Sequence, residues 1–169
     1  MNITDFSKHY KVRILNEKDI DDIYSLCSQN ELYYKYCPPF VTKENIKQDM
    51  QALPPNKELK DKYYIGYFDD DRLVAVMDFI KEYPNDKTAF IGFFMVDITK
   101  QKRGLGSSII EELCDYLENE NFSYIRLGWV LNNEQASHFW KKNKFVETGT
   151  TYKTDDYTVV VAQRELHFK

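Results

Sequence analysis

Hydrophobic and polar residues follow two different periods along this chain, and together they predict an α/β fold. Leucines and isoleucines recur on one helical face across residues 105–117, whereas residues 10–15 alternate as in a half-buried strand. Clusters of Gly, Pro, Asn and Asp separate such segments and indicate turns. The patterns predict strands at 10–15, 62–68, 73–81, 89–98, 124–130, 145–153 and 157–163, helices at 19–28, from 42, at 104–120 and at 134–142, and a tail at 165–169.

Two features of this order specify the sheet. The run 89–98 is almost continuously apolar, which is typical of a strand covered on both faces. A strand, a helix and another strand follow one another from 89 to 130, and such a connection makes a parallel pair. The earlier strands are joined by short turns, which favours an antiparallel meander. The sequence therefore predicts a mixed, mostly antiparallel central sheet with one parallel strand–helix–strand crossover and helices on both faces.

The composition is that of an ordinary globular protein, and its 169 residues predict a single domain, residues 1–169. The longest apolar stretch, 88–96, is far shorter than the roughly 20 residues of a membrane span, and the first residues lack the pattern of a signal peptide. Three widely spaced cysteines fit a reducing compartment, which predicts a cytoplasmic protein. They form no ligand spacing with the histidines, so no metal site is predicted. A net charge of -4 argues against a general nucleic-acid-binding role.

Residues 101–108, Gln-Lys-Arg-Gly-Leu-Gly-Ser-Ser, join a buried strand to an amphipathic helix. Glycines let backbone N–H groups approach a ligand closely, and the first turn of a helix offers unpaired N–H donors at the positive end of the helix dipole. Such a helix start binds anions, phosphates above all, and the two basic residues and two serines of the loop would add to that binding. The alternative is a tight turn with solvated charges.

Three established motifs do not fit this loop. A dinucleotide-binding fingerprint needs a small residue where Ile109 stands and an acidic residue where Arg126 lies. A P-loop needs Gly-Lys-Ser/Thr, but Ser107 follows Gly106. A nucleophile elbow needs Gly-x-Ser-x-Gly, which is absent from the loop. By itself the loop would also suit another phosphate-containing cofactor.

Taken with the residues after it, the loop resembles the pyrophosphate loop of the GNAT acetyltransferase superfamily. Its Gln-x-x-Gly-x-Gly pattern at 101–106 follows a strand that ends in Phe-Met-Val-Asp at 94–97. Tyr-Ile-Arg-Leu at 124–127 is similar to the family's fifth strand, and Asn-x-x-Ala-x-x-Phe-Trp-x-Lys-x-x-Phe at 133–145 is similar to its last helix motif. The specific resemblance covers residues 89–148.

The resemblance implies that the protein binds acetyl-CoA and passes the acetyl group to an amine. Residues 102–107 would hold the pyrophosphate through backbone N–H groups, and the pantetheine arm would lie where the fourth and fifth strands splay apart. Gly128 suits a close backbone approach there or a relief of crowding. Asn133 would contact the cofactor, cap the following helix, or do both. The residues predicted to bind coenzyme A are Met95, Val96, Gln101, Lys102, Arg103, Gly104, Leu105, Gly106, Ser107, Asn133 and Trp140.

Two residues depart from the family pattern. Many members carry a Tyr that protonates the departing thiolate, and Trp140 occupies that position here. An indole N–H does not release a proton at neutral pH, so no general acid is assigned, and a thiol with a pKa of about 8.5 is a fair leaving group without one. Many members also carry a Gly directly before the last Phe of the motif, and Lys144 occupies that position here. It lies at a predicted helix end, where a cation is favourable but a left-handed backbone is unfavourable for Lys.

Catalysis requires the acceptor amine to lose a proton, because an amine with a pKa of about 10.4 is mostly protonated at neutral pH. Asp78, inside an apolar strand, and Asp97, directly after the pantetheine-pairing residues, are the candidate proton acceptors, and each could instead be structural. Glu31, Tyr33 and Tyr34 are candidates for binding the acceptor, because an acid and aromatic faces suit a cationic amine. The alternative for these three residues is hydrophobic packing under the helices.

The leading hypothesis is an N-acetyltransferase that moves the acetyl group of acetyl-CoA to the primary amine of a small molecule or peptide by direct transfer in a ternary complex. No Cys with a partnered base lies in the motif region, which argues against an acyl-cysteine intermediate. Trp140 keeps open a second hypothesis, a non-catalytic module that senses acyl-CoA. The expected partner is the amine acceptor, with neither nucleic acid nor membrane, and the aromatic final strands leave a homodimer open.

Overall fold

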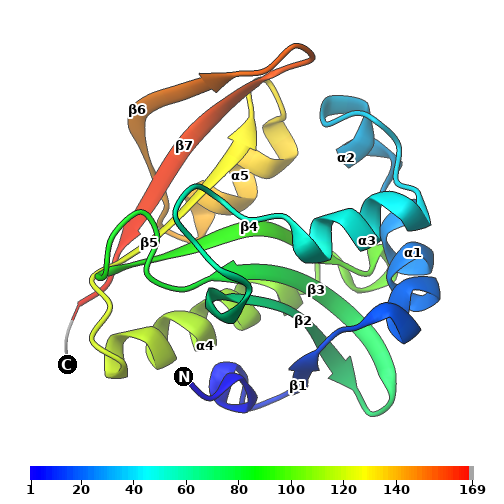
Figure 1. The fold of residues 1–169 in the computed structure, drawn as a ribbon, viewed down its shortest axis with the longest axis horizontal. Coiled ribbons are helices and arrows are strands. Elements are labelled where there is room, and N and C mark those ends of the chain that lie inside the picture. Colours follow the sequence, from blue (N-terminus) through cyan, green and yellow to red (C-terminus); the bar gives the residue numbers. More distant parts are fainter. Residues whose placement is uncertain (168–169) are drawn as a thin grey trace.

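One seven-stranded sheet runs through the middle of the molecule in the order β1-β2-β3-β4-β5-β7-β6 (Figure 1). The computed structural model describes residues 1–167. Neighbouring strands are antiparallel except β4 and β5, which are parallel and connected through α4. The predicted mixed sheet with one parallel crossover is confirmed. The strands are β1 (Lys11–Ile14), β2 (Lys62–Asp69), β3 (Arg72–Ile80), β4 (Thr88–Val96), β5 (Tyr124–Val130), β6 (Val146–Lys153) and β7 (Thr158–Glu165).

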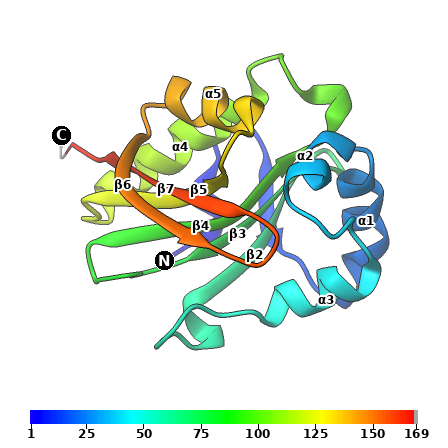
Figure 2. The ribbon, with the colours of Figure 1, turned by 90° about the horizontal axis from the view of Figure 1, so that it is seen from above.

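Helices cover the two faces of the sheet (Figure 2). On one face α1, α2 and α3 pack over a core that includes Ile23, Ile46 and Tyr64. On the other face α4 and α5 contribute residues such as Ile109 and Trp140 to a larger core. No helix within residues 1–167 is long and apolar enough to cross a bilayer. The helices are α1 (Ile20–Ser28), α2 (Glu31–Tyr36), α3 (Lys43–Gln51), α4 (Leu105–Asn119) and α5 (Glu134–Lys142).

Most elements begin and end within two residues of their predicted bounds, because strong local signals mark them. Along α4, every fourth residue from Leu105 to Leu117 is apolar and buried against the sheet. Thr42 ends the preceding loop and caps α3, since its hydroxyl oxygen accepts a hydrogen bond from the Asn45 N–H at 3.1 Å. The bounds of β5 and α5 coincide with the prediction.

Two predictions are wrong for individual elements. No helix was expected between α1 and α3, but residues 31–36 form α2, a short helix with no fully buried side chain. Its Tyr33 and Tyr34 are partly buried against the core on this face. The predicted tail is partly structured: Glu165 ends β7, and Leu166 is buried and donates its N–H to the Ser123 carbonyl at 2.8 Å. Residues 168 and 169 of that predicted tail lie outside the described residues.

β4 and β5 diverge partway along their length. Residues 88–91 of β4 pair with residues 124–127 of β5, but the pairing stops there. Beyond this point residues 93–96 keep their pairing with β3, while residues 128–130 pair with β7. The facing edges of the two strands are therefore left without a strand partner, which is the splay that the family resemblance implies.

A bulge in β4 lies at the point of divergence. In the pairing of β3 with β4, Asp78 faces Phe93 and Phe79 faces Ile91, so Gly92 is an extra residue without a counterpart. Bulges bend a strand and increase its twist. Gly92 thus accounts for the turn of β4 away from β5, and it marks the apex of the opening in the sheet.

Candidate active site

Asp78 lies at the apex where β4 leaves β5. A Cβ atom added to Gly92 would come within 2.9 Å of Asp78 Oδ2. The glycine therefore leaves room for the carboxylate, and its backbone is exposed at this point. The bulge, the unpaired strand edge and the carboxylate meet at one place, which makes it the candidate reaction centre.

Lys62 of β2 holds Asp78 in an ion pair. Its Nζ lies 2.7 Å from each carboxylate oxygen, and its side chain is only 2% exposed, against 15% for Asp78. The same ammonium lies 5.7 Å from the centroid of the Tyr64 ring. Burial raises the pKa of Asp78, and the charge and hydrogen bonds of Lys62 oppose that rise. Asp78 is therefore a partly accessible carboxylate whose charge is balanced by one buried cation.

The predicted phosphate loop turns tightly into the start of α4. Gly104 caps the helix with a left-handed backbone, φ 85°, and Lys102 also has a positive φ of 59°. The Ser108 N–H donates to the Gly104 carbonyl at 2.9 Å. Within residues 1–167, the backbone N–H groups of residues 102–107 find no acceptor. Free N–H donors at the positive end of a helix dipole are the arrangement that favours an anion.

Basic side chains flank this helix start. A hollow of about 350 Å³ beside it is lined by Lys100 and Arg103, among other residues. Lys100 Nζ lies 3.4 Å from a carboxylate oxygen of Asp69, and Lys102 is exposed on the same loop. Lys100 was not predicted as a binding residue. It lies directly before the predicted phosphate loop, and a basic side chain at that place in the sequence could have indicated it.

Gly106 brings α4 into contact with α5. A Cβ atom there would lie 3.1 Å from the Phe139 ring and 3.4 Å from Val96 Cγ2, so a larger residue would push Phe139 aside. The rings of Phe139 and Phe94 stack with centroids 6.1 Å apart, and Trp140 contacts both. Trp140 is buried in this aromatic cluster. Its indole is part of the core beneath the splayed strand.

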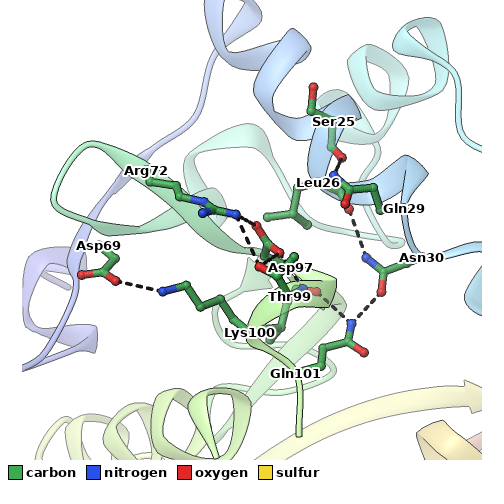
Figure 3. Close-up of polar contacts among 11 residues, drawn as sticks. Ser25, Leu26, Gln29, Asn30, Asp69, Arg72, Asp97, Thr99, Lys100 and Gln101 are labelled. Carbon is green, nitrogen blue, oxygen red and sulfur yellow. Dashed lines mark hydrogen bonds and ion pairs between the residues drawn. The ribbon is translucent and has the colours of Figure 1, made fainter. Parts of the chain in front are cut away.

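Gln101 ties the loop to the end of β4 and to α1 (Figure 3). Its Nε2 donates to Asn30 Oδ1 at 2.6 Å and to the Val96 carbonyl at 2.9 Å. Asn30 in turn donates to the Leu26 carbonyl at 3.0 Å, at the end of α1. Both amide hydrogens of Gln101 are therefore used within the protein, and its side chain positions the loop.

Asp97 is held at the same end of β4. It accepts hydrogen bonds from the Thr99 N–H at 2.8 Å, the Thr99 hydroxyl at 2.7 Å and the Arg72 guanidinium at 2.8 Å (Figure 3). Burial alone would raise the pKa of Asp97, but these hydrogen bonds outweigh it and the pKa lies below its ordinary value. Because its charged form is stabilised, Asp97 is a weak base. The geometry favours Asp78 over Asp97 as a proton acceptor.

Residues that flank β5 and α5 have visible structural roles. Asn133 caps α5, with Oδ1 accepting from the Ala136 N–H at 3.1 Å. Gly128 relieves crowding, since a Cβ atom there would lie 2.5 Å from Val159 Cγ1, and β5 pairs regularly with β7 through it. Lys144 adopts the left-handed backbone, φ 67°, that the family's usual glycine would favour.

Tyr33 and Tyr34 lie on the α1–α3 face beside the splayed part of β4. The Tyr33 ring centroid is 5.7 Å from that of Phe93 and 5.0 Å from that of Tyr34. Burial raises the pKa of both phenols. Glu31, by contrast, is exposed at the start of α2, and it makes no hydrogen bond or ion pair within residues 1–167. Of the three predicted acceptor residues, the structure brings the two tyrosines toward the apex and not Glu31.

Three residues of the candidate site were not predicted from the sequence: Lys62, Gly92 and Asp49. Asp49 of α3 shares the electrostatic environment of the pair, because burial raises its pKa, Lys62 lowers it and Asp78 raises it. Asp49 follows the buried Ile46 by three positions, and residues with this spacing lie on the same face of a helix. No group of three or more His, Cys, Asp or Glu side chains in the described part of the chain could hold a metal ion.

A sheet that opens between two parallel strands, with an anion-binding helix start at the opening, defines the class of acetyltransferases that the sequence resembles. The family model of the acetyltransferase (GNAT) family matches residues 23–145, and the chain belongs to that family. Members of the family use acetyl-CoA as the acetyl donor. No relative was found among the curated protein sequences.

Solved structures share the whole fold at low sequence identity. An acetyltransferase from Thermus thermophilus superimposes with a TM-score of 0.74 at 18% identity, over 98% of this chain and 100% of that one. The ribosomal-protein-S18-alanine N-acetyltransferase of Escherichia coli has a TM-score of 0.67 at 15% identity, over 95% and 96%. A spermidine N-acetyltransferase from Vibrio cholerae, in complex with CoA and spermine, has a TM-score of 0.68 at 16% identity, over 95% and 97%. These similarities establish the fold.

Proposed function

We propose that this protein is an acetyl-CoA-dependent N-acetyltransferase that acts on a primary amine of a small molecule or peptide by direct transfer in a ternary complex. The observation that carries the proposal is the divergence of β4 from β5 at Gly92. From Asp78, which faces Phe93, the splayed residues of β4 run to Val96, ahead of the loop with the free N–H groups at the start of α4. The family membership supports the same activity.

The chain offers a continuous set of contacts for acetyl-CoA along this opening. The N–H groups of residues 102–107 and the cations Lys102 and Arg103 would neutralise the pyrophosphate. The backbone of Met95 and Val96, on the splayed edge of β4, would pair with the amides of the pantetheine arm. Asn133, already the cap of α5, would offer its remaining polar groups to the same arm. Trp140 and its aromatic neighbours would support the strand from below.

Acetyl-CoA would supply an activated acyl group, and the residues of the chain would manage the proton of the amine. The ammonium form first gives up one proton and becomes the attacking amine. As the C–N bond forms and the C–S bond breaks, the nitrogen loses a second proton, and the leaving sulfur can gain one. Asp78 is the proposed acceptor of the amine proton, with Lys62 holding its carboxylate in place. No acid is assigned to the sulfur, because the indole N–H of Trp140 cannot supply a proton.

Asp78→Asn tests this assignment. We expect the variant to lose about 100-fold or more in kcat, the usual contribution of a positioned base, while the Kd for acetyl-CoA stays near that of the wild type. Asp71→Asn, in the exposed β2–β3 turn, is the matched control and should change neither quantity. Circular dichroism checks that both variants are folded. Unchanged turnover in Asp78→Asn would remove Asp78 from the mechanism, whereas loss of acetyl-CoA binding would assign it a structural role.

We also propose that residues 1–169 form one acetyltransferase domain, since a single sheet extends from Lys11 to Glu165. A cytoplasmic location is proposed because the three cysteines are free, as in a reducing compartment. The alternative of an acyl-CoA sensor predicts tight acetyl-CoA binding with no acetylated product from any amine.

A further inference from the structure

Asn30 is the junction between α1 and α2, and all four of its polar atoms are used there. Its N–H donates to the Cys27 carbonyl at 3.0 Å, and its carbonyl accepts from the Tyr33 N–H at 3.1 Å. Its Nδ2 donates to the Leu26 carbonyl at 3.0 Å, and its Oδ1 accepts from Gln101 Nε2 at 2.6 Å. Asn30 is only 8% exposed. A buried amide whose polar atoms are all hydrogen-bonded fixes the arrangement of the groups around it.

The hydrogen bond between Gln101 and Asn30 joins the two sides of the proposed site (Figure 3). Gln101 directly precedes the loop at 102–107, and its Nε2 also donates to the Val96 carbonyl at 2.9 Å, at the end of β4. Asn30 directly precedes α2. One side-chain amide therefore connects the loop proposed to hold the cofactor with a helix on the acceptor side.

α2 has less support from the core than the helices on either side of it. It has six residues and no fully buried side chain, whereas α1 buries three side chains and α3 buries two. A helix this short is not stable by itself. Its Tyr33 ring lies 5.7 Å, between centroids, from that of Phe93, which faces Asp78 in the pairing of β3 with β4. α2 therefore opens at low cost, and its opening moves Tyr33 away from the proposed reaction centre.

We infer that Asn30 is a positioning residue, through which acetyl-CoA bound at the loop holds α2 in place beside Asp78. The inference rests on the proposed function. When α2 opens, Gln101 loses one of its two acceptors and the loop loses that restraint, so a fixed loop and a closed α2 favour each other. A ligand shifts such an equilibrium by its different affinity for the two states. Acetyl-CoA would bind the fixed loop, and it would thereby favour the closed α2.

Hydrogen–deuterium exchange of the backbone amides, followed by mass spectrometry, tests the inference. In the wild type, acetyl-CoA should slow exchange in residues 102–108, where it would bind. It should also slow exchange in residues 31–37 by about 2-fold to 10-fold, the effect of one neutral hydrogen bond. The second effect occurs at a distance from the ligand, and it needs no knowledge of the amine acceptor.

Two variants remove the connection from opposite ends. Gln101→Met deletes the donor, and Asn30→Ala deletes the acceptor but keeps the hydrogen bond between Gln101 and the Val96 carbonyl. With saturating acetyl-CoA, both variants should keep the slowed exchange in residues 102–108 and lose the slowing in residues 31–37. If Gln101→Met no longer binds acetyl-CoA, Asn30→Ala decides, because its loop keeps the bond to β4.

Gln29→Met is the matched control. It deletes the same amide group from the residue next to Asn30, but Gln29 Nε2 donates to the Ser25 carbonyl at 2.8 Å, within the same segment (Figure 3). Acetyl-CoA should therefore slow exchange in residues 31–37 of this variant as much as in the wild type.

A role of Asn30 in the junction alone predicts a different result, in which α2 exchanges faster in Asn30→Ala and acetyl-CoA still slows it as in the wild type. That result would overturn the inference and leave the proposed function intact. So would a wild type in which acetyl-CoA slows exchange in residues 102–108 and not in residues 31–37. A wild type in which acetyl-CoA slows exchange in neither segment would refute the proposed function, and the inference with it.

Discussion

Removing the cation of the Lys62–Asp78 pair should strongly destabilise the fold. Lys62→Met keeps an unbranched apolar side chain but deletes the ammonium, which leaves Asp78 as a carboxylate with no cation beside it. Removing one partner of a buried pair costs about 3–5 kcal/mol. Asp78 is 15% exposed and Lys62 only 2%, so water reaches the remaining charge in part. We therefore expect a loss of about 3 kcal/mol in the free energy of unfolding.

Urea denaturation followed by tryptophan fluorescence measures this loss in a double-mutant cycle. Replacing both residues, as Lys62→Met with Asp78→Leu, removes both charges and should cost much less than the single change, because apolar pairs replace buried ion pairs at little cost. Lys60→Met is the matched control, since the Lys60–Glu58 pair has a similar separation of 2.8 Å but side chains 73% and 71% exposed. It should cost less than about 1 kcal/mol. Equal losses for Lys62→Met and Lys60→Met, or additive effects in the cycle, would refute the reasoning.

The same variant has a consequence for pH dependence. Lys62 lowers the pKa of Asp78 against the effect of burial, so the pKa should rise when Lys62 is removed. The native state of Lys62→Met then binds a proton more tightly than the unfolded state does. Its stability deficit should shrink as the pH falls through the raised pKa of Asp78. If Asp78 takes the amine proton, the acid limb of the pH–rate profile should move to higher pH.

Two further predictions concern the loop and its support. Gly104→Ala should cost about 1–2 kcal/mol of stability because φ is 85° there, and it should also weaken acetyl-CoA binding in a calorimetric titration. Gly149→Ala, with φ 84° and equally open space, should cost the same stability and leave acetyl-CoA binding unchanged; equal effects of both on binding would contradict the role of the loop. Asp97→Asn should lower stability at neutral pH by about 1–3 kcal/mol. Because the native pKa of Asp97 is lowered, the difference from the wild type in urea midpoint should begin to shrink as the pH falls below about 4 and should vanish only below the native pKa. A constant difference would contradict this.

The elements with strong periodic patterns could be predicted from the sequence alone. α4 is long, and its apolar stripe repeats for several turns, so its position was within one residue of the prediction. α2 could not be predicted in this way, because a helix of six residues is too short to be stable by itself. Its position depends on tertiary contacts such as that between Tyr33 and Phe93.

The part of the candidate site that is formed by backbone, the glycine loop before α4, could be predicted from the sequence. The part that is formed by paired side chains could not. Glycines before a helix predict an anion-binding loop without any knowledge of the sheet. The partnership of Lys62 with Asp78 depends on the register of β2 against β3, in which Tyr64 faces Asp78. That register cannot be read from two apolar strands. The bulge at Gly92 was likewise hidden within a continuous apolar run.

The most direct test of the proposed acetyltransferase activity is to follow the acetyl group itself. The protein is incubated with acetyl-CoA that carries an isotope-labelled acetyl group and with diaminobutane, and free thiol and labelled amine are measured in the same sample. Direct N-acetylation predicts that labelled acetylamine and free CoA thiol appear in equal amounts, at a rate that Asp78→Asn greatly reduces. Tight binding of acetyl-CoA with no labelled product from this or any other primary amine would contradict it.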